Sequence, residues 1–270
     1  MNDNPPAQPR KAATVALYDW NSTLWHEDQA SQQAANRFYG VEVAMKLAVD
    51  AMPPLLKACG VTADVETDAG AFQSFAWHRF LQAPLSLRAT YTLLERGHVQ
   101  DALTLVRRHI ETLAAIHYFA LRPAELKGHR LGERRVNFKT MLNVVAPGLY
   151  GYYTNFLSEA AHSGGTVEAH LAMDSSDPVG GVTHDENWIS TVQNWAVPIA
   201  LAYPSSMPGV QGIAVLPLEA KLGFDAVRAK YAEWQASHMK VNPRSSRFYG
   251  AISPLLGLRA SKSAGGRGQR

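Results

Sequence analysis

A polar cluster closes the stretch YYTNFLSEAAHSGG, residues 152–165. The stretch is typical of an apolar helix that ends at the glycine pair Gly164-Gly165. On that helix Ser158 and His162 stand at i and i+4, so their side chains share a face. A histidine beside a hydroxyl can act as a general base, because its ordinary pKa of about 6.5 lies near working pH. A structural role fits equally, in which His162 interacts with the helix dipole and Ser158 bonds back to its own helix.

A second candidate group lies on the helix expected over residues 98–121, where Arg107 or Arg108 can pair with Glu111. Such pairs are usually solvated and contribute little to stability. The preceding helix carries Arg88, however. A bundle that covered both faces would turn Arg88, Arg108 and Glu111 into a buried charged network that needs partners. The sequence leaves both alternatives open.

Metal and nucleotide chemistry have less support. His170, Asp174 and the stretch THDE at 183–186 could bind a divalent metal. These residues lack a fixed ligand spacing, and THDE also fits a helix N-cap followed by first-turn acids. The chain has no glycine-rich phosphate loop, nucleophile elbow or H-E-x-x-H motif. We therefore expect no metal site and no cofactor.

Helices must position all of these residues. The clearest covers 98–121, where an apolar seam steps alternately by four and three residues. His117 continues this seam and is expected to be a hydrogen-bonded core histidine. A helix over 86–97 ends at a glycine, so the two helices should form a hairpin with a very short connection. Further helices are expected over residues 21–50, 71–81, 133–145, 149–162, 183–203 and 217–240. Pro53 and Pro54 are expected to end the helical region at 21–50. A kink is expected at Pro198, within the helix over 183–203.

The helical patterns and the lack of convincing strands predict an all-α protein. We expect a helical bundle with irregular proline- and glycine-rich connections in its C-terminal half. A single helical domain is expected over residues 14–240. A disordered arm at 1–13 precedes it, and a loop and a basic disordered tail at 241–270 follow it.

The net charge of +3 comes from the C-terminal tail, because residues 259–270 hold four basic side chains and no acid. The remaining chain is nearly neutral, so a pI near 8.9 does not imply a basic nucleic-acid-binding body. The one cysteine, Cys59, is expected to be a buried structural thiol. The N-terminus lacks the apolar core of a signal peptide, and prolines break the most apolar run. These features predict a cytoplasmic protein without a membrane span.

The hairpin sequence LRATYTLLERGHVQDALTLVRRHIETLAAIHYF is followed by the segment FLSEAAHSG. Together they resemble an uncharacterised group of bacterial helical proteins. That group has an R-x4-L-L-x2-G hairpin, an A-x2-L-x-R-x3-E helix and a terminal Y-x2-L-S-x3-H segment. The resemblance covers about residues 85–165. It picks out Arg88, Leu93, Leu94, Gly97, Ala102, Leu105, Arg108, Leu157, Ser158 and His162, with Glu111 at a three-residue spacing.

The group is similar in turn to HEPN proteins. These are helical bundles of bacterial defence and toxin–antitoxin systems, and many are metal-independent ribonucleases with an R-x4–6-H motif at a helix end. His162 stands in the corresponding place, but Asn155 lies where a preceding arginine is needed. The literal match, Arg122 to His129, contains a proline and a glycine, which argue against a continuous helix there.

The resemblance implies an RNA site. We expect His162 to be the general acid or base and Ser158 a positioning hydroxyl. Arg108 would clamp the phosphate, and Glu111 would orient Arg108. The expected substrate contacts are Arg88, Tyr153 and Asn155.

Two functions from different classes follow. The first is a HEPN-like RNA-cleaving or RNA-binding protein of a defence or toxin system, with RNA and a cognate antitoxin as partners and a homodimer as a candidate assembly. The alternative is a non-catalytic helical protein–protein interaction module. Its partner surface would include the aromatic residues Trp188, Trp195 and Trp234.

Overall fold

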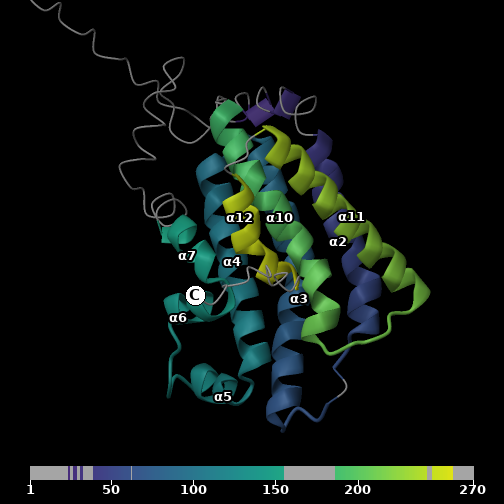
Figure 1. Cartoon of the computed structure of the whole chain (residues 1–270), viewed down its shortest axis with the longest axis vertical. Coiled ribbons are helices and arrows are strands. Elements are labelled where there is room, and N and C mark those ends of the chain that lie inside the picture. The colour runs from purple at the N-terminus through teal and green to yellow at the C-terminus, as the bar shows by residue number, and fades with distance from the viewer. Residues whose placement is uncertain are drawn as a thin grey trace, which may run out of the picture.

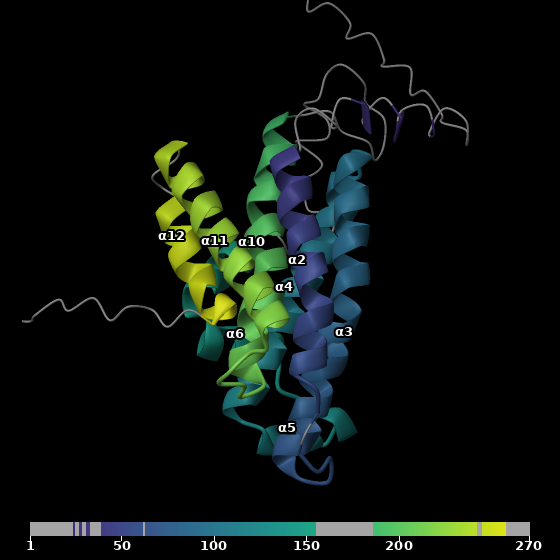
Figure 2. The ribbon, with the colours of Figure 1, turned by 90° about the vertical axis from the view of Figure 1, so that its right-hand side faces the viewer.

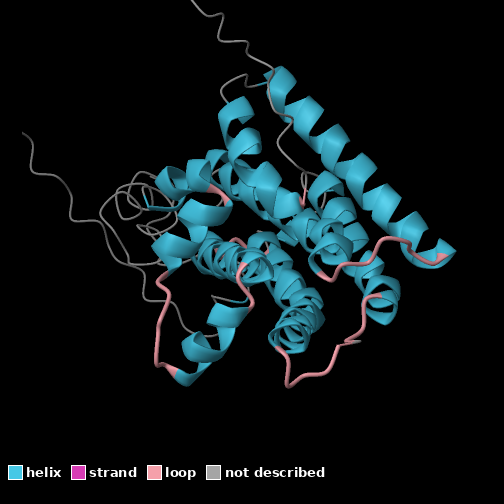
Figure 3. Cartoon of the chain, turned by 60° about the horizontal axis from the view of Figure 1, so that its bottom comes forward, coloured by secondary structure: helices cyan, strands magenta, loops and turns pink. Residues whose placement is uncertain are grey.

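The computed structural model describes residues 24, 27, 28, 31, 32, 39–61, 63–154, 186–241 and 245–257. Within these ranges the regular structure is helical and contains no strand, as Figure 3 shows. The prediction of an all-α protein is therefore confirmed. The expected arm at 1–13 and the tail beyond residue 257 lie outside the described residues.

Four long helices form the core of the bundle (Figure 1). They are α2 (Tyr39–Ala58), α3 (Asp68–Glu95), α4 (Val99–Leu121) and α10 (Glu186–Val210). Each contacts the next in a closed ring, because α2 packs on α3, α3 on α4, α4 on α10, and α10 on α2. Helix α11 (Leu218–Val241) lies along α2 and α10 on the outside of this ring (Figure 2). Cys59, just after α2, is fully buried, as expected, and burial raises its pKa to about 11.

Shorter helices cover the ends and one side of α4. They are α5 (Ala124–Leu131), α6 (Phe138–Val145), η1 (Pro147–Leu149), α7 (Tyr150–Tyr152), α12 (Ser245–Ile252) and η3 (Ser253–Leu256). Three of them correct the sequence-based expectations. Helix α5 forms despite Gly128 within it and Pro123 just before it, since Pro123 takes the N-cap position, where its missing N–H costs nothing. Helix α12 and η3 lie where a loop was expected, because Tyr249, Ile252 and Leu255 are buried against the bundle.

Prolines do not end the long helices. Helix α2 runs through Pro53 and Pro54, which were expected to stop it. Helix α3 runs through Pro84, so the two separate helices expected over 71–97 are one. A proline inside a helix costs about 3 kcal/mol. Burial on both sides of Pro84 offsets that cost, because Phe80 and Leu87 are almost completely inaccessible.

The predicted hairpin between α3 and α4 is confirmed, with a turn at Gly97. Gly97 adopts a left-handed conformation with φ of 80°. Its N–H donates to the Leu94 carbonyl at 3.1 Å, and the N–H of His98 donates to the Leu93 carbonyl at 2.8 Å. These two bonds form a Schellman motif that satisfies the last carbonyls of α3. The turn therefore fixes how α3 lies against α4.

Substituting Gly97 with alanine is expected to lower the free energy of unfolding by about 1–2 kcal/mol, because a Cβ penalises the left-handed conformation. Urea denaturation measures the change. Gly209→Ala is the control, since Gly209 is exposed in α10 with open space around it, and it should leave stability unchanged or raise it by up to about 1 kcal/mol. Equal effects of the two substitutions would contradict the assigned role of the turn.

Candidate functional site

Helices α3, α4 and α5 enclose a cleft of about 750 Å³, which we call the arginine cleft. Three arginines line it, one from each helix: Arg79 from α3, Arg108 from α4 and Arg130 from α5. All three side chains are exposed. The other polar lining residues are Ser74, His78, Gln82, Glu111, Thr112 and His129.

The α3 wall of the arginine cleft is a single helix face. Ser74, His78 and Gln82 follow one another at four-residue spacing, which aligns their side chains along the helix. Arg79 stands beside them with its guanidinium 5.4 Å from the centre of the Phe75 ring. This cation–π contact holds the long side chain against α3. The opposite face of α3 is buried in the core, so the polar face must point outward.

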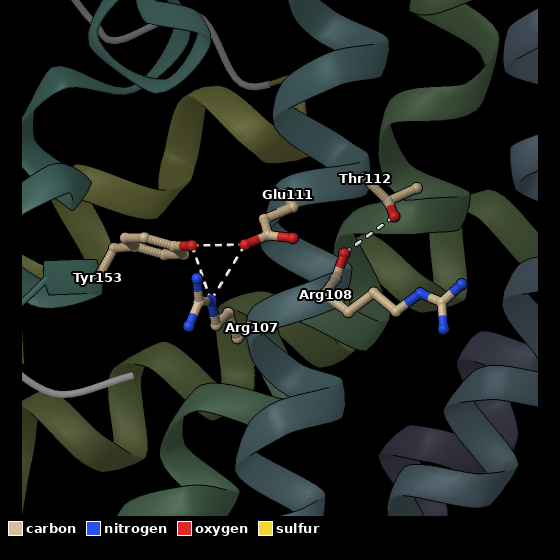
Figure 4. A network of polar contacts seen from close by, with 5 residues as sticks. All are labelled: Arg107, Arg108, Glu111, Thr112 and Tyr153. Atoms are coloured by element: carbon tan, nitrogen blue, oxygen red, sulfur yellow. Dashed lines mark hydrogen bonds and ion pairs between the residues drawn. The ribbon is translucent and has the colours of Figure 1, made fainter. Parts of the chain in front are cut away.

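The α4 wall is formed around Arg108 and Thr112. The Thr112 hydroxyl donates to the Arg108 carbonyl at 2.9 Å, so it is held by its own helix. The Arg108 guanidinium extends away from Glu111, and Figure 4 shows no contact between the two side chains. Arg108 is thus open to the cleft.

Glu111 is held by Arg107 and Tyr153 instead. The Arg107 Nε donates to Glu111 at 3.1 Å and to the Tyr153 hydroxyl at 2.8 Å, and that hydroxyl donates to Glu111 in turn (Figure 4). Burial and the Glu111 carboxylate hold the pKa of Tyr153 above its ordinary value. The expected role of Glu111 as the partner that orients Arg108 is not what the geometry shows. Tyr153 belongs to this triad and does not line the arginine cleft.

Helix α5 supplies the third wall. His129 and Arg130 both line the arginine cleft. The backbone N–H of Val136 donates to His129 Nδ1 at 3.1 Å, and the ring lies 5.1 Å from the ring of Phe119. Arg122, the other end of the literal R-x6-H match, does not line the cleft. Its side chain instead pairs with Glu125 at 3.4 Å.

A second cleft of about 270 Å³ continues from the arginine cleft and shares Arg79, Gln82, Arg108 and Thr112 with it. His109 lies at its base and is 3% exposed. The Thr90 hydroxyl donates to the Ser86 carbonyl at 3.0 Å, so its oxygen accepts from His109 Nε2 at 3.2 Å. The proton of His109 therefore sits on Nε2, and Nδ1 accepts from the Tyr203 hydroxyl at 2.9 Å. Burial lowers the pKa of His109 to about 4.

The remaining predicted residues divide into two groups. Ser158, His162 and Asn155 lie outside the described residues, so their roles stay predictions. Arg88 is exposed on α3 and lines neither of the two clefts that contain Arg108. The alternative of a buried network through Arg88 and Arg108 is wrong, because both side chains face solvent.

The structure also describes some of the other residues that the sequence analysis singled out. His117 is hydrogen-bonded, as expected, through Nε2 to the Leu255 carbonyl at 3.0 Å. Trp195 is 7% exposed and packs on Phe248, so it belongs to the core and not to a partner surface. Trp234 is half-buried, and the Trp188 side chain lies outside the described residues. Among the described residues no group of three His, Cys, Asp or Glu side chains could hold a metal, and the candidate stretch at 170–185 is not among them.

Sequence reasoning missed His78, Arg79 and Arg130 of the arginine cleft, and it set His129 aside as the end of the literal R-x6-H match. The four-residue spacing from Ser74 to Gln82 could have revealed the α3 face. That signal was lost when the region was divided near Pro84 into two helices. The R-x6-H match was the signal that marked α5, and it was rejected because the stretch contains Pro123 and Gly128.

No helix of the described residues has the length and apolar character needed to cross a bilayer. Comparison of the chain with protein-family models, with curated proteins and with solved structures gives no match in any of the three. The HEPN-like arrangement therefore remains a prediction.

Acid is expected to destabilise the protein through His109, which is buried, and His117, which is half-buried. Burial lowers the pKa of His109 and of His117 from 6.5 to about 4. Between these values the unfolded chain binds more protons than the folded one, so stability is lost as the pH falls from 6.5 toward 4. The loss should reach roughly 3 kcal/mol per histidine by pH 4. Chemical denaturation across this pH range measures it.

The matched variant is His117→Gln, because a glutamine amide can still donate to the Leu255 carbonyl but does not titrate. Its stability should fall less steeply between pH 6.5 and 4 than that of the unmodified protein. Parallel curves for the two proteins would contradict the assignment of His117 as a group that is neutral in the folded protein.

Proposed function

We propose that this protein binds RNA in the arginine cleft. The observation that carries the proposal is the convergence of Arg79, Arg108 and Arg130 from three helices onto one cleft. Within the described part of the chain, none of the three forms an ion pair with a carboxylate. Guanidinium groups gathered without counter-charges attract an anion, and phosphate matches their planar donor geometry.

The one carboxylate in the lining does not neutralise these arginines. Glu111 accepts from Arg107 and Tyr153, on the side of α4 away from the Arg108 guanidinium (Figure 4). Its charge is therefore compensated by Arg107. The cleft keeps a positive potential although the chain outside its tail is nearly neutral.

The size and lining of the clefts favour a nucleic acid over a lone phosphate. A volume of about 750 Å³ can enclose a ligand as large as a nucleotide, and the second cleft extends the same surface. Gln82 and Thr112 line both clefts and can bond sugar hydroxyls or base edges. The resemblance of the hairpin sequence to HEPN-like proteins favours RNA among polyanions. Control by an antitoxin belongs to the same proposal. Cleavage through His162 stays a prediction from the sequence, because that residue lies outside the described residues.

Arg108→Ala is expected to weaken binding of a single-stranded RNA by about tenfold, because it removes a charge-assisted contact to phosphate. Each arginine removed should also reduce the slope of log affinity against log salt by roughly 0.7. Fluorescence anisotropy with a labelled oligonucleotide at several salt concentrations measures both effects. The same result is expected for Arg79→Ala.

Arg228→Ala provides a matched control. The Arg228 guanidinium lies 5.5 Å from the Phe224 ring on α11, in the same arrangement as Arg79 and Phe75 on α3. It is exposed but lines a separate cleft. RNA affinity should be unchanged in this variant. Equal losses for Arg228→Ala and Arg108→Ala would indicate non-specific charge and would overturn the proposed site.

A further inference from the structure

Two histidines line the arginine cleft, and the backbone fixes a different tautomer for each. His78 Nδ1 lies 2.7 Å from the Ser74 carbonyl. A carbonyl only accepts, so Nδ1 of His78 carries a proton. His129 Nδ1 accepts from the backbone N–H of Val136 at 3.1 Å, so the proton of His129 is on Nε2. When both rings are neutral, they present opposite groups at Nε2, a lone pair on His78 and an N–H on His129.

Both rings are held in place. The His78 ring stands edge-on to Trp77 with centroids 5.4 Å apart, and the His129 ring packs on Phe119. Among the described residues, no hydrogen-bond partner occupies Nε2 of either ring. The bond from His78 to Ser74 survives when Nε2 takes up a proton. The bond from Val136 survives only while His129 stays neutral, because a second ring proton would replace the acceptor.

The other described histidines are engaged elsewhere. His98 pairs with Glu27 at 2.9 Å, while His109 and His117 are bonded inside the bundle. His238 on α11 bonds the Trp234 carbonyl at 2.9 Å and does not line the arginine cleft. Within the described part of the chain, His78 and His129 are thus the histidines that can reach an RNA bound by the arginines.

We propose that the arginine cleft cleaves the RNA it binds, with His78 as the general base and His129 as a neutral donor to the phosphate. This inference rests on the proposed RNA binding and assigns chemistry to the same site. The reaction is an internal transesterification, which needs a 2′-hydroxyl and therefore RNA. Arg79, Arg108 and Arg130 hold the scissile phosphate and compensate the charge that develops on it.

In the proposed reaction one bond to phosphorus forms as another breaks, and each proton that is removed has an acceptor. His78 Nε2 removes the proton of the 2′-hydroxyl, and the 2′-oxygen forms a bond to phosphorus as the bond from phosphorus to the 5′-oxygen breaks. His129 Nε2–H donates to a non-bridging phosphate oxygen and keeps its proton. The leaving 5′-oxygen takes a proton from water in the open cleft, and the hydroxide so formed accepts the proton from His78. The products are a 2′,3′-cyclic phosphate and a 5′-hydroxyl.

The test uses the full chain with a labelled single-stranded RNA in EDTA, followed by analysis of the product ends. We expect cleavage that leaves cyclic phosphate. A DNA oligonucleotide of the same sequence, which has no 2′-hydroxyl, should bind in the cleft but remain intact. His78→Gln should lower the single-turnover rate by at least about 100-fold while RNA affinity changes less than twofold, because a general base contributes on that scale.

The role of His129 as a hydrogen-bond donor is tested with two variants. His129→Gln places an amide donor near the Nε2 position and should retain more activity than His129→Leu, which has no donor. His238→Gln is the control, since His238 has the same bond to a carbonyl one helical turn before it as His78, and it should cleave at the unmodified rate. Circular dichroism and thermal unfolding confirm that each variant is folded.

The outcomes separate this inference from the proposed function. RNA that binds through Arg108 but is never cleaved would overturn the chemistry and leave the binding site intact. Cleavage in EDTA that persists in His78→Gln would place the reaction at other residues, with His162 the first to test. Loss of activity together with loss of RNA affinity in His78→Gln would make His78 a binding residue. No RNA binding by the unmodified protein would overturn both proposals.

Discussion

A single buried imidazole, that of His109, joins three of the four core helices. It donates to Thr90 on α3 and accepts from Tyr203 on α10, while its own backbone belongs to α4. A buried polar group without partners would cost about 1–3 kcal/mol, so both nitrogens must find these bonds in the folded state. This requirement fixes the rotation of α4 within the bundle. Arg108 precedes His109 in the chain and is thereby turned outward, toward the cleft.

The second constraint is the separation of charges on α4. Arg107 and Arg108 are neighbours, yet they point to different sides of the helix (Figure 4). Arg107 satisfies Glu111 together with Tyr153, and this leaves Arg108 without a carboxylate among the described residues. If Glu111 paired with Arg108, the wall of the cleft would be neutral. Tyr153, which connects α4 to the segment after α6, is therefore important for the charge of a cleft that it does not line.

Much of the fold could be predicted from local patterns. The seam of α4 from Leu103 to Leu113 and the glycine turn before it depend only on residues close in sequence, so helix and hairpin were both foreseen. The continuous α3 could not be, because the cost of Pro84 is offset by burial against helices distant in sequence. For the site, Arg108 was recognised, but its partners were not. Arg79 lies on the other helix of the hairpin. Arg130 lies on α5, a helix that was not expected because Pro123 precedes it and Gly128 lies within it. Only the tertiary structure therefore shows that the three arginines line one cleft.

Helix α5 is the least buried wall of the arginine cleft, and this affects how the helix moves. Helix α5 spans eight residues, and Leu126 is the one fully buried side chain that it contributes. Its backbone amides should therefore exchange with solvent through local opening at a much lower free energy than those of α3 and α4, which are buried along their length. An anion bridging Arg130 to Arg79 and Arg108 would suppress that opening, since ligand binding stabilises the state that it contacts. Helix α5 would then behave as a hinged wall whose closure is coupled to occupancy of the cleft.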